Sequence, residues 1–503
     1  MRLSKAFNPL TQLNMRNILL LSAVLTTMLL GCQESKTDAP SVGVQFASVP
    51  NAYNSQTLLV PEGTQTDIIY RGAADSVMTD EGVMRLSKKK IDFLAYIPID
   101  GSSEHGKLFM NHELRDSNTI LGDGGGMSWL EVQKVDGQWQ QIGDAHYIDF
   151  DELGGTWHNC GGEVTPHGTI LTAEEYPPFS NEELYHNGEH FRDTSDFNGL
   201  KRNENMGWMV EVDVATQKPL HKLWHMGRYS HEDTYSTPDG KTVYLTDDFG
   251  PCVFFKFEAD TPHDYTQGQL YAYQQSEDGA TGQWLAMPME MDSLIHARQV
   301  ALHMGATMFK SHEWIDAYDG KIYISESGGG FDYTEGIAQG GQLARHLQQA
   351  PLAIGNNKTQ DWFGRMLVFD PETNKMEVFL EGGETPDGGY FSVPDGMLIR
   401  EVKGQPYLFV CEDASLGSIT GAQIESYEQK KLYLEVYMIP IASDGSADYV
   451  GIKRLAVGPE GCEMTGLEFT PDGKTLFLTV QHPSEDNPAP YNRSTIVALT
   501  GIF

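Results

Sequence analysis

A short hairpin unit recurs six times along the chain and leaves few folds open to it. Each copy has a glycine-containing turn, a short strand rich in Val, Ile, Leu, Tyr and Phe, and then an acidic or amide residue. The turn glycines of the six copies are Gly106, Gly168, Gly240, Gly320, Gly404 and Gly473. Turns that combine Gly with Pro, Asp or His between apolar runs are typical of β-hairpins.

Five of the copies also have a strand ahead of the turn, and that strand opens on an acid or a thiol. The opening residues are Cys160, Glu232, Glu313, Asp395 and Glu463. Both open ends of such a hairpin lie on the same side. Six hairpins arranged radially would therefore direct these residues toward one shared axis.

Repeated β-units predict an all-β fold, which we interpret as a six-bladed β-propeller with loop and short-helix insertions. The units are longer than the roughly 40–50 residues of simple propeller blades. The surplus is expected in polar insertions at 176–206 and 331–362, and 338–350 is the best candidate for a short helix. Two packed β-sandwich domains are the alternative, because hairpins alone do not prove radial closure.

The N-terminus has the features of an export signal. A basic segment at 2–16 precedes an apolar run at 18–30, and that run is shorter than the roughly 20 residues of a membrane-spanning helix. The next residues, Leu29-Leu30-Gly31-Cys32, resemble a bacterial lipoprotein processing site. The predicted location is therefore the periplasm or the cell surface, with the outer membrane favoured.

These features predict three segments. Residues 1–32 form a lipoprotein-type signal peptide with Cys32 acylated, residues 33–60 form a tether, and residues 61–503 form a single β-propeller domain. The lipid would be the chain's only contact with the membrane.

The chain is strongly acidic, with 70 Asp and Glu residues against 35 Lys and Arg and a formal net charge of −35. Such a surface repels nucleic-acid backbones and anionic lipid headgroups, so we expect no nucleic-acid partner. The excess acid could form a solvated coat or supply the oxygen ligands that hard cations prefer. We expect the protein to be a monomer.

Radial closure would gather many acidic residues and one thiol at one end of the axis. They are Glu113, Cys160, Glu174, Glu175, Glu232, Asp247, Asp248, Glu313, Glu326, Asp395, Glu412, Asp413 and Glu463. So many negative charges cannot all stay ionised without compensation. Clustered carboxylates are ligands of calcium, whereas the softer thiolate of Cys160 indicates iron or zinc. Taken singly, a pair such as Asp247-Asp248 could equally face solvent.

Three histidine–glutamate pairs occur in these segments: His112-Glu113, His231-Glu232 and His312-Glu313. One such pair is more often an ordinary hydrogen-bonding group, but three of them, two at equivalent hairpin positions, favour a site. The HExxH, GxSxG and P-loop motifs are absent. The sequence therefore does not indicate a zincin, a serine hydrolase or a nucleotide kinase.

Five segments resemble motifs of the PhoX-type alkaline phosphatases, in the order in which that family has them. They are NHE (111–113), NCGGEVTPHGTILTAEE (159–175), GRYSHED (227–233), FSVPDGML (391–398) and GCEMTGLEFTPDGKTLFLTVQHP (461–483). The resemblance implies a six-bladed propeller whose channel mouth holds two iron ions and several calcium ions. It also implies hydrolysis of small-molecule phosphate monoesters outside the cytoplasm.

The residue pattern and the resemblance together give an expected site. The expected metal ligands are Glu113, Cys160, Glu174, Glu175, Glu232, Glu313, Asp395 and Glu463. The expected catalytic residues are Cys160, Glu232, Lys310 and Glu313. The expected substrate-binding residues are His112, Lys310 and His312.

The chain departs from the family pattern at several positions. Ser311-His312-Glu313 stands where the family usually has Arg-Pro-Glu, and Gly396 stands where it has Asn. The segment SESGGG at 325–330 offers no arginine for phosphate, and the leader lacks twin arginines. Two alternatives therefore stay open: a calcium-dependent propeller hydrolase of another ester class, such as a lactonase with a histidine base, and a non-catalytic metal-binding surface lipoprotein.

Overall fold

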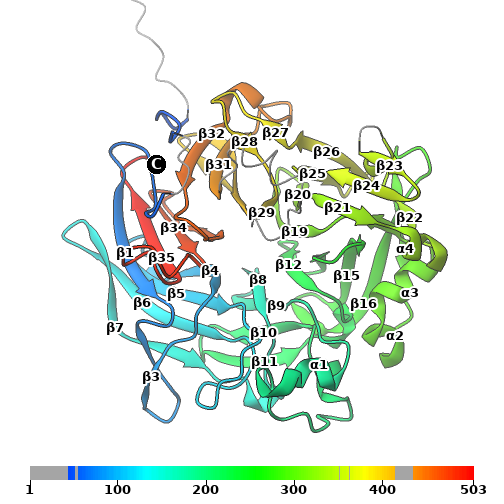
Figure 1. The fold of residues 1–503 in the computed structure, drawn as a ribbon, viewed down its shortest axis with the longest axis horizontal. Helices are drawn as coiled ribbons and strands as arrows, with labels where there is room; N and C mark the ends of the chain where they lie inside the picture. Colours follow the sequence, from blue (N-terminus) through cyan, green and yellow to red (C-terminus); the bar gives the residue numbers. More distant parts are fainter. Residues whose placement is uncertain (1–42, 51–54, 350–351, 362, 414–433) are drawn as a thin grey trace, which may run out of the picture. The chain divides into compact units, whose positions relative to one another are not determined.

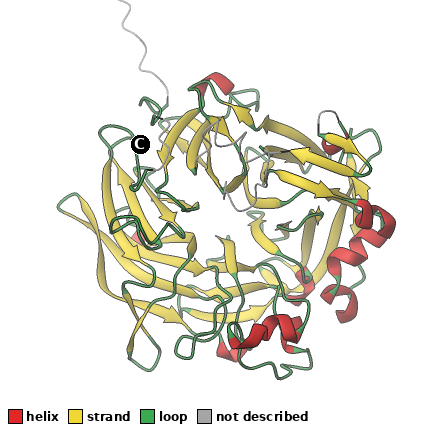
Figure 2. Ribbon diagram, viewed as in Figure 1, coloured by secondary structure: helices red, strands yellow, loops and turns green. Residues whose placement is uncertain are grey.

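The computed structural model describes residues 43–50, 55–349, 352–361, 363–413 and 434–503. This part of the chain consists of β-strands with few, short helices (Figure 1; Figure 2), which confirms the all-β prediction. The predicted signal peptide and Cys32 lie outside the described residues. Within the described residues, no helix is long and apolar enough to cross a membrane.

Six sheets each begin with one of the predicted hairpins. The hairpin strands are β4 (Ile91–Pro98) with β5 (His105–His112), β8 (Asn159–Val164) with β9 (Thr169–Glu174), β12 (His231–Ser236) with β13 (Thr242–Asp247), β19 (His312–Tyr318) with β20 (Lys321–Glu326), β29 (Pro394–Val402) with β30 (Gln405–Glu412), and β33 (Met464–Phe469) with β34 (Thr475–Val480). The first strands of successive hairpins contact one another in chain order, and β33 contacts β4. Figure 1 shows these first strands nearest the common centre of the sheets.

Further strands complete each sheet on its outer side. They are β6 (Met127–Val135), β7 (Gln138–Ile148), β2 (Ser76–Met78) and β3 (Met84–Leu86) in the first sheet; β10 (Met209–Asp213) and β11 (Lys218–Lys222) in the second; β15 (Phe255–Thr261), β16 (Asp264–Gln275) and β17 (Gly282–Ala286) in the third; β25 (Arg365–Asp370) and β26 (Lys375–Glu381) in the fourth; β31 (Glu435–Pro440) and β32 (Lys453–Val457) in the fifth; and β35 (Thr495–Thr500) and β1 (Gln65–Arg71) in the sixth. Because β1 pairs with β35, strands from near both ends of the described chain share the sixth sheet.

Short helices and small sheets occupy the insertions. The α-helices are α1 (Asn181–Tyr185), α2 (Met291–Ile295), α3 (Ala297–His303) and α4 (Thr334–Gln339). The small sheets are β14 (Cys252–Val253) with β18 (Thr307–Phe309) and β22 (Gln342–Leu343), β21 (Gly329–Asp332) with β24 (Lys358–Asp361) and β23 (Ala353–Gly355), and β27 (Gly383–Glu384) with β28 (Tyr390–Phe391). The predicted helix at 338–350 is wrong, because α4 ends before Gly340, whose φ is 115°, and β22 follows.

Short 3-10 turns connect several strands. They are η1 (Ile99–Gly101), η2 (Asp151–Leu153), η3 (His186–Gly188), η4 (Arg202–Asn205), η5 (Trp224–Met226), η6 (His346–Gln348) and η8 (Tyr449–Gly451). The first of them forms the turn of the first hairpin, so Gly106 lies not in that turn but inside β5, opposite Pro98. The other five predicted turn glycines all adopt a positive φ, as tight turns require.

One compact unit of the chain spans Val42–Phe503. The described part of the predicted tether, 43–50 and 55–60, packs on the sheets. The backbone N–H of Val44 donates to the Tyr407 hydroxyl at 2.9 Å, and Leu59 forms a β-bridge with Val457. Val44 is 2% exposed, so it behaves as a core residue.

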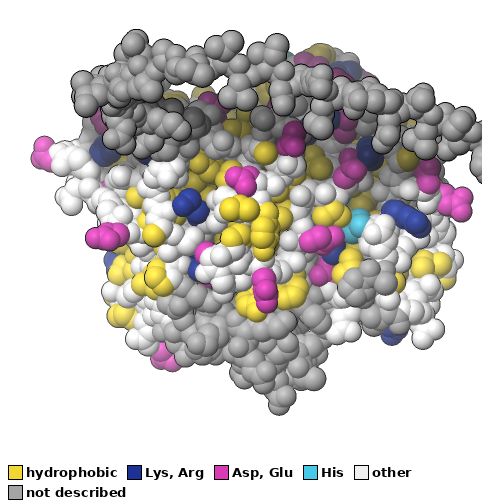
Figure 3. Space-filling view, turned by 90° about the horizontal axis from the view of Figure 1, so that it is seen from above, with side chains coloured by type: hydrophobic (Ala, Val, Ile, Leu, Met, Phe, Trp, Pro, Cys, Tyr) yellow, Lys and Arg dark blue, Asp and Glu magenta, His cyan; other side chains and the backbone are white. Residues whose placement is uncertain are grey.

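Buried apolar side chains from different sheets form continuous clusters. One cluster joins Phe93 of β4, Ile170 of β9, Trp314 of β19 and Leu408 of β30. Burial of such surface stabilises a fold by about 25 cal/mol per Å². In the described part of the face shown in Figure 3, Asp and Glu side chains are scattered with Lys and Arg among them. Part of the acidic excess is therefore a solvated coat.

Buried or half-buried carboxylates also join the first strands of neighbouring sheets. Three such bonds run from a backbone N–H to a carboxylate: Ser236 to Glu163 at 2.8 Å, Ile315 to Asp233 at 3.0 Å, and Ile399 to Asp316 at 2.6 Å. Each first strand lies at the edge of its own sheet, where backbone groups lack a ladder partner. The carboxylates satisfy these groups and hold adjacent sheets together.

We expect Asp316→Ala to lower the free energy of unfolding by about 2–3 kcal/mol, because it leaves the Ile399 N–H without its charged acceptor. Urea unfolding followed by fluorescence measures the change. The control is Glu372→Ala at an exposed position, where we expect a change within about 0.5 kcal/mol. Equal unfolding midpoints for Asp316→Ala and the wild type would contradict the proposed link between sheets.

Candidate metal centre

A cavity of about 220 Å³ lies between the hairpins, and we call it the acidic cavity. Its carboxylates are Glu113, Glu175, Glu232, Asp248, Glu313, Asp395, Asp413 and Glu463, and Cys160 adds a thiol. The other lining residues are Tyr176, Ser311, Ser327, Gly328 and Val393. Within the described residues, no lysine, arginine or histidine lines it.

Bulges in the first strands direct about half of these acidic side chains and the Cys160 thiol into the acidic cavity. The pairing register slips around Asp92 in β4, Cys160 in β8, Glu232 in β12, Glu313 in β19 and Asp395 in β29. Bulges commonly redirect side chains beside active sites. Asp92 thus occupies in β4 the place that Cys160 has in β8, and its carboxylate accepts a hydrogen bond from the Cys160 thiol at 3.2 Å.

The ends of the second strands supply the other half. The residue directly after each of the first five second strands lines the acidic cavity: Glu113, Glu175, Asp248, Ser327 and Asp413. In the sixth hairpin this residue is Gln481, whose side-chain amide donates to Glu113 at 2.6 Å and to Asp92 at 3.0 Å. Six equivalent positions therefore converge, although two of them carry no acid.

The residue before each of these points the other way, because successive side chains of a strand alternate. The structure accordingly places Glu174 outside the acidic cavity, in contrast to its expected role as a metal ligand. Glu174 is fully buried, pairs with Lys222 at 2.7 Å and accepts the Gly207 N–H at 2.8 Å. Asp247 likewise pairs with Arg298, and Glu326 pairs with Arg365.

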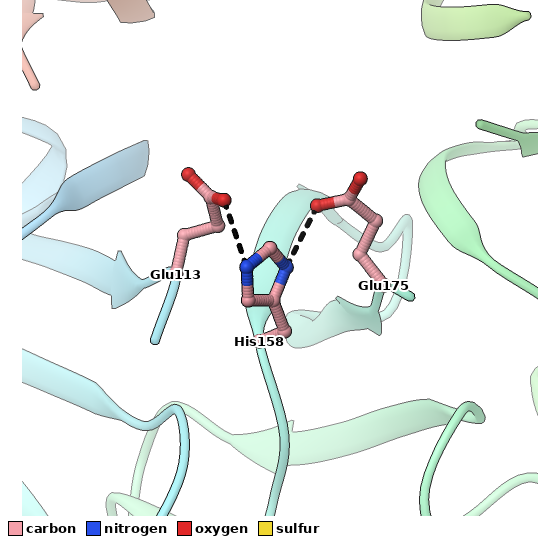
Figure 4. A group of neighbouring side chains, drawn as sticks. All are labelled: Glu113, His158 and Glu175. Atoms are coloured by element: carbon pink, nitrogen blue, oxygen red, sulfur yellow. Dashed lines mark hydrogen bonds and ion pairs between the residues drawn. The ribbon is translucent and has the colours of Figure 1, made fainter. Parts of the chain in front are cut away.

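Three groups of side chains could hold a metal ion, and they combine residues that line the acidic cavity with His158, which lies behind that lining. They are Glu113 with His158 and Glu175, Cys160 with Glu175 and Glu232, and Glu232 with Glu313 and Asp395. Within each group the ligand atoms lie within 4.8 Å of one another. Figure 4 shows the imidazole of His158 between two carboxylates, with Nε2 3.0 Å from Glu113 and Nδ1 2.9 Å from Glu175. Shared members link the three groups into one chain.

The charges in these groups call for compensation. Burial and the neighbouring carboxylates raise the pKa of Glu175, Glu232, Glu313 and Asp395 well above the ordinary value. Burial also raises the pKa of the Cys160 thiol, as do Asp92 and Glu232. Without a cation these groups would therefore have to hold protons.

His158 also needs a proton or a cation, in this case beside one of its ring nitrogens. Burial lowers its pKa to about 3, so the imidazole is neutral and carries one N–H for two flanking carboxylates. Its other contact requires a proton or a cation. Asp395 has a buried Oδ1 with no hydrogen-bond partner among the described residues. Oxygen, nitrogen and sulfur donors with unused capacity fit metal ions.

The three expected substrate-binding residues do not line the acidic cavity. His112 bonds Ser128 Oγ at 2.9 Å, and His312 lies 3.8 Å from Glu326; both are fully buried. Lys310 is also fully buried, and its Nζ bonds the carbonyl oxygen of Ser327. Each of these side chains is directed into the protein, whereas the adjacent glutamate or serine faces the acidic cavity.

Sequence reasoning did not single out His158, Asp92, Tyr176, Ser327 or Gln481. Alignment of the six hairpins at their bulges would have identified Asp92, and alignment at their second strands would have identified Ser327 and Gln481. His158 has no equivalent in the other units, and its φ of 46° is unusual for a residue other than glycine. The four cysteines of the described chain are all free and buried.

Comparisons with known proteins identify the family of the chain. A family model described as alkaline phosphatase PhoX matches residues 136–484. The chain is similar to the structure of Pseudomonas fluorescens PhoX in complex with vanadate, a transition state analogue. That match has a TM-score of 0.68 and 21% identity, and covers 91% of this chain and 98% of that chain. No curated protein sequence matches.

Two other structures match with lower scores. Trypanosoma rangeli sialidase in complex with sialic acid has a TM-score of 0.39 and 10% identity, over 88% of this chain and 59% of that one. Pseudomonas aeruginosa periplasmic gluconolactonase has a TM-score of 0.37 and 10% identity, over 89% of this chain and 99% of that one. The family match covers well over half of the sequence. The chain therefore belongs to the alkaline phosphatase PhoX family that its motifs resemble, and it is a metal-dependent phosphatase.

Proposed function

We propose that the protein hydrolyses phosphate monoesters of small molecules in the acidic cavity, outside the cytoplasm. The observation that carries this proposal is the convergence of eight carboxylates and the Cys160 thiol on one cavity, in a chain of the PhoX family. Further support comes from the similar Pseudomonas fluorescens structure, which is described as a complex with a transition state analogue.

For the metals we propose two iron ions and several calcium ions, the set implied by the resemblance. The group of Cys160, Glu175 and Glu232 suits iron, because thiolate is a soft ligand. The group of Glu113, His158 and Glu175 suits a second iron, and that of Glu232, Glu313 and Asp395 suits calcium. Glu463 completes the proposed ligand set. Bound cations would neutralise phosphate charge and act as Lewis acids.

The chain's own residues would then bind and orient the substrate. Because no lysine or arginine among the described residues lines the acidic cavity, an anionic phosphate is attracted only when cations reverse the local field. The hydroxyls of Ser311 and Ser327 can donate to phosphate oxygens. We assign Lys310 a positioning role, since its ammonium holds the carbonyl of Ser327 and does not face the substrate.

For the architecture we propose that the six sheets are the blades of a six-bladed β-propeller. The cyclic order of contacts between the first strands, closed by β33 and β4, supports it. We further propose a signal peptide at 1–32, a lipid on Cys32 that anchors the chain at the outer membrane, and a monomeric enzyme facing the periplasm or cell surface.

The experiment that tests the function is elemental analysis of purified protein together with turnover of p-nitrophenyl phosphate by the same sample. We expect iron near two per chain, calcium, and turnover that disappears on chelation. Calcium alone with no turnover would favour the lactonase or the non-catalytic alternative.

We expect Cys160→Ser to lose iron and to lower turnover by at least about a hundredfold, because the hard serine hydroxyl replaces a soft ligand. Mass spectrometry of bound metals and p-nitrophenyl phosphate turnover measure both effects. The control is Cys252→Ser, which changes a buried thiol outside the acidic cavity and should retain metals and activity. Full iron and full turnover in Cys160→Ser would overturn the ligand assignment.

Chelated protein should become less stable as the pH rises. Burial and Asp413 raise the pKa of Glu463 to about 8 in the folded state. The stability from its protonated form is fully present below the unfolded-state pKa and is lost as the pH rises through about 8. We expect the melting temperature of chelated protein to fall between pH 5 and pH 9, and that of metal-loaded protein to fall much less. Calorimetry on both forms measures this, and parallel pH profiles would refute it.

A further inference from the structure

A second cavity, of about 310 Å³, lies beside the acidic cavity and has the opposite character. It lies between the insertion that carries α1 and the segment of α2 and α3, and its cationic side chains are Lys201, Arg228 and Arg298. Glu204 is the only carboxylate among its lining residues in the described chain. We call it the basic cavity. A cavity rich in Lys and Arg is unusual in a chain of net charge −35, which suggests that it has a function.

The two cavities share one wall. Tyr176 lines the acidic cavity, and the next residue, Pro177, lines the basic cavity. Asp248 lines the acidic cavity, while the preceding Asp247 pairs with Arg298 of the basic cavity. The Tyr176 N–H donates to Ser230 Oγ at 2.8 Å, directly after Tyr229 of the basic cavity. A ligand that occupied both cavities would therefore have to cross this one wall.

Arg228 is the cation without a counterion. Its Nε donates to the carbonyl of Met206 at 2.7 Å, and its Nη2 donates to those of Pro178 at 2.7 Å and Asn203 at 3.0 Å. Within the described residues it makes no ion pair, whereas Lys201 pairs with Glu204 and Arg298 with Asp247. Burial lowers the pKa of Arg228 only to about 10, so it stays charged at neutral pH. Arg228 is half-buried, and its hydrogen-bond partners are neutral carbonyls, so a bound anion would supply the counter-charge that it lacks.

Tyr229 adds an unused donor. Its hydroxyl is buried with no hydrogen-bond partner among the described residues, and the residue is 2% exposed. The ring is fixed by stacking on Phe255 at 4.3 Å between centroids. Buried hydroxyls are nearly always satisfied, so this one also points to a missing acceptor.

We propose that the basic cavity binds a second anionic group, a carboxylate or a phosphate, of the substrate whose phosphate ester lies in the acidic cavity. Arg228 supplies the charge and Tyr229 donates a hydrogen bond to the same oxyanion. The preferred substrates are then phosphate monoesters of organic acids or bisphosphorylated compounds rather than of neutral alcohols. This inference rests on the proposed function for the location of the ester phosphate.

The test compares phosphonates that cannot be hydrolysed. Metal-loaded protein is titrated calorimetrically with alkylphosphonates and with ω-carboxyalkylphosphonates and α,ω-bisphosphonates of matching chain length. At the length that spans the shared wall, we expect the second anionic group to tighten binding by about tenfold, the effect of one charged hydrogen bond. The carboxylate and bisphosphonate arms distinguish the two sources of the anion. Equal affinities at every chain length would overturn the proposal.

Variants locate the effect. Tyr229→Phe keeps the stacked ring and should reduce the preference about threefold, Arg228→Lys should keep part of it, and Arg228→Met should abolish it. Alkylphosphonate affinity and p-nitrophenyl phosphate turnover should stay within about twofold of the wild type, which also shows that the variants are folded. A preference that survives Arg228→Met unchanged would overturn the assignment.

Failure of the proposed function gives a different result. If the wild type neither binds alkylphosphonates nor hydrolyses p-nitrophenyl phosphate, the acidic cavity is not a phosphatase site. Succinate, which carries no phosphate, then reports on the basic cavity alone. Binding that is lost in Arg228→Met would support the anion site, and no binding to the wild type would overturn it.

Discussion

Repulsion among buried carboxylates is the constraint on which the rest of the site depends. Eight of them share one cavity, in surroundings where each raises the pKa of its neighbours. Such an arrangement is stable only if protons or cations neutralise it. Two further groups lack a neutralising partner. The neutral imidazole of His158 lies between two carboxylates, and one oxygen of Asp395 has no hydrogen-bond partner among the described residues. The scaffold holds together groups that would otherwise separate.

The scaffold manages this through strand ends that divide their acids between two faces. In the second and third hairpins one acid of each pair, Glu175 or Asp248, enters the acidic cavity, and the acid before it is neutralised inside the protein by Lys222 or Arg298. In the fourth hairpin Ser327 enters the acidic cavity, and Arg365 neutralises the preceding Glu326. These ion pairs lie on the protein side of the second strands and hold the ends of those strands in place. Carboxylates on the first strands, such as Asp316, join neighbouring sheets. Acid residues thus serve both the site and the frame that supports it.

The hairpins and most of the acids at their open ends could be predicted from the sequence, because the pattern of strand, glycine turn, strand and acidic residue recurs along the chain. The choice between Glu174 and Glu175 could not, since it depends on where the strand ends and on which face the next side chain takes. The position of His158 is set by a backbone conformation that has no equivalent in the other hairpins, so it leaves no periodic pattern. The orientation of His112 and His312 away from the acidic cavity follows from the alternation of side chains along a strand.

The pairing of β1 with β35 has a consequence for biogenesis. The sheet that supports Glu463 contains a strand from residues 65–71 and another from residues 495–500, so it cannot form while residues 495–500 are still in the ribosome. The proposed ligand set that includes Glu463 is therefore complete only after these residues have emerged and paired with β1. Capture of metal ions by this ligand set would then be a late event in folding.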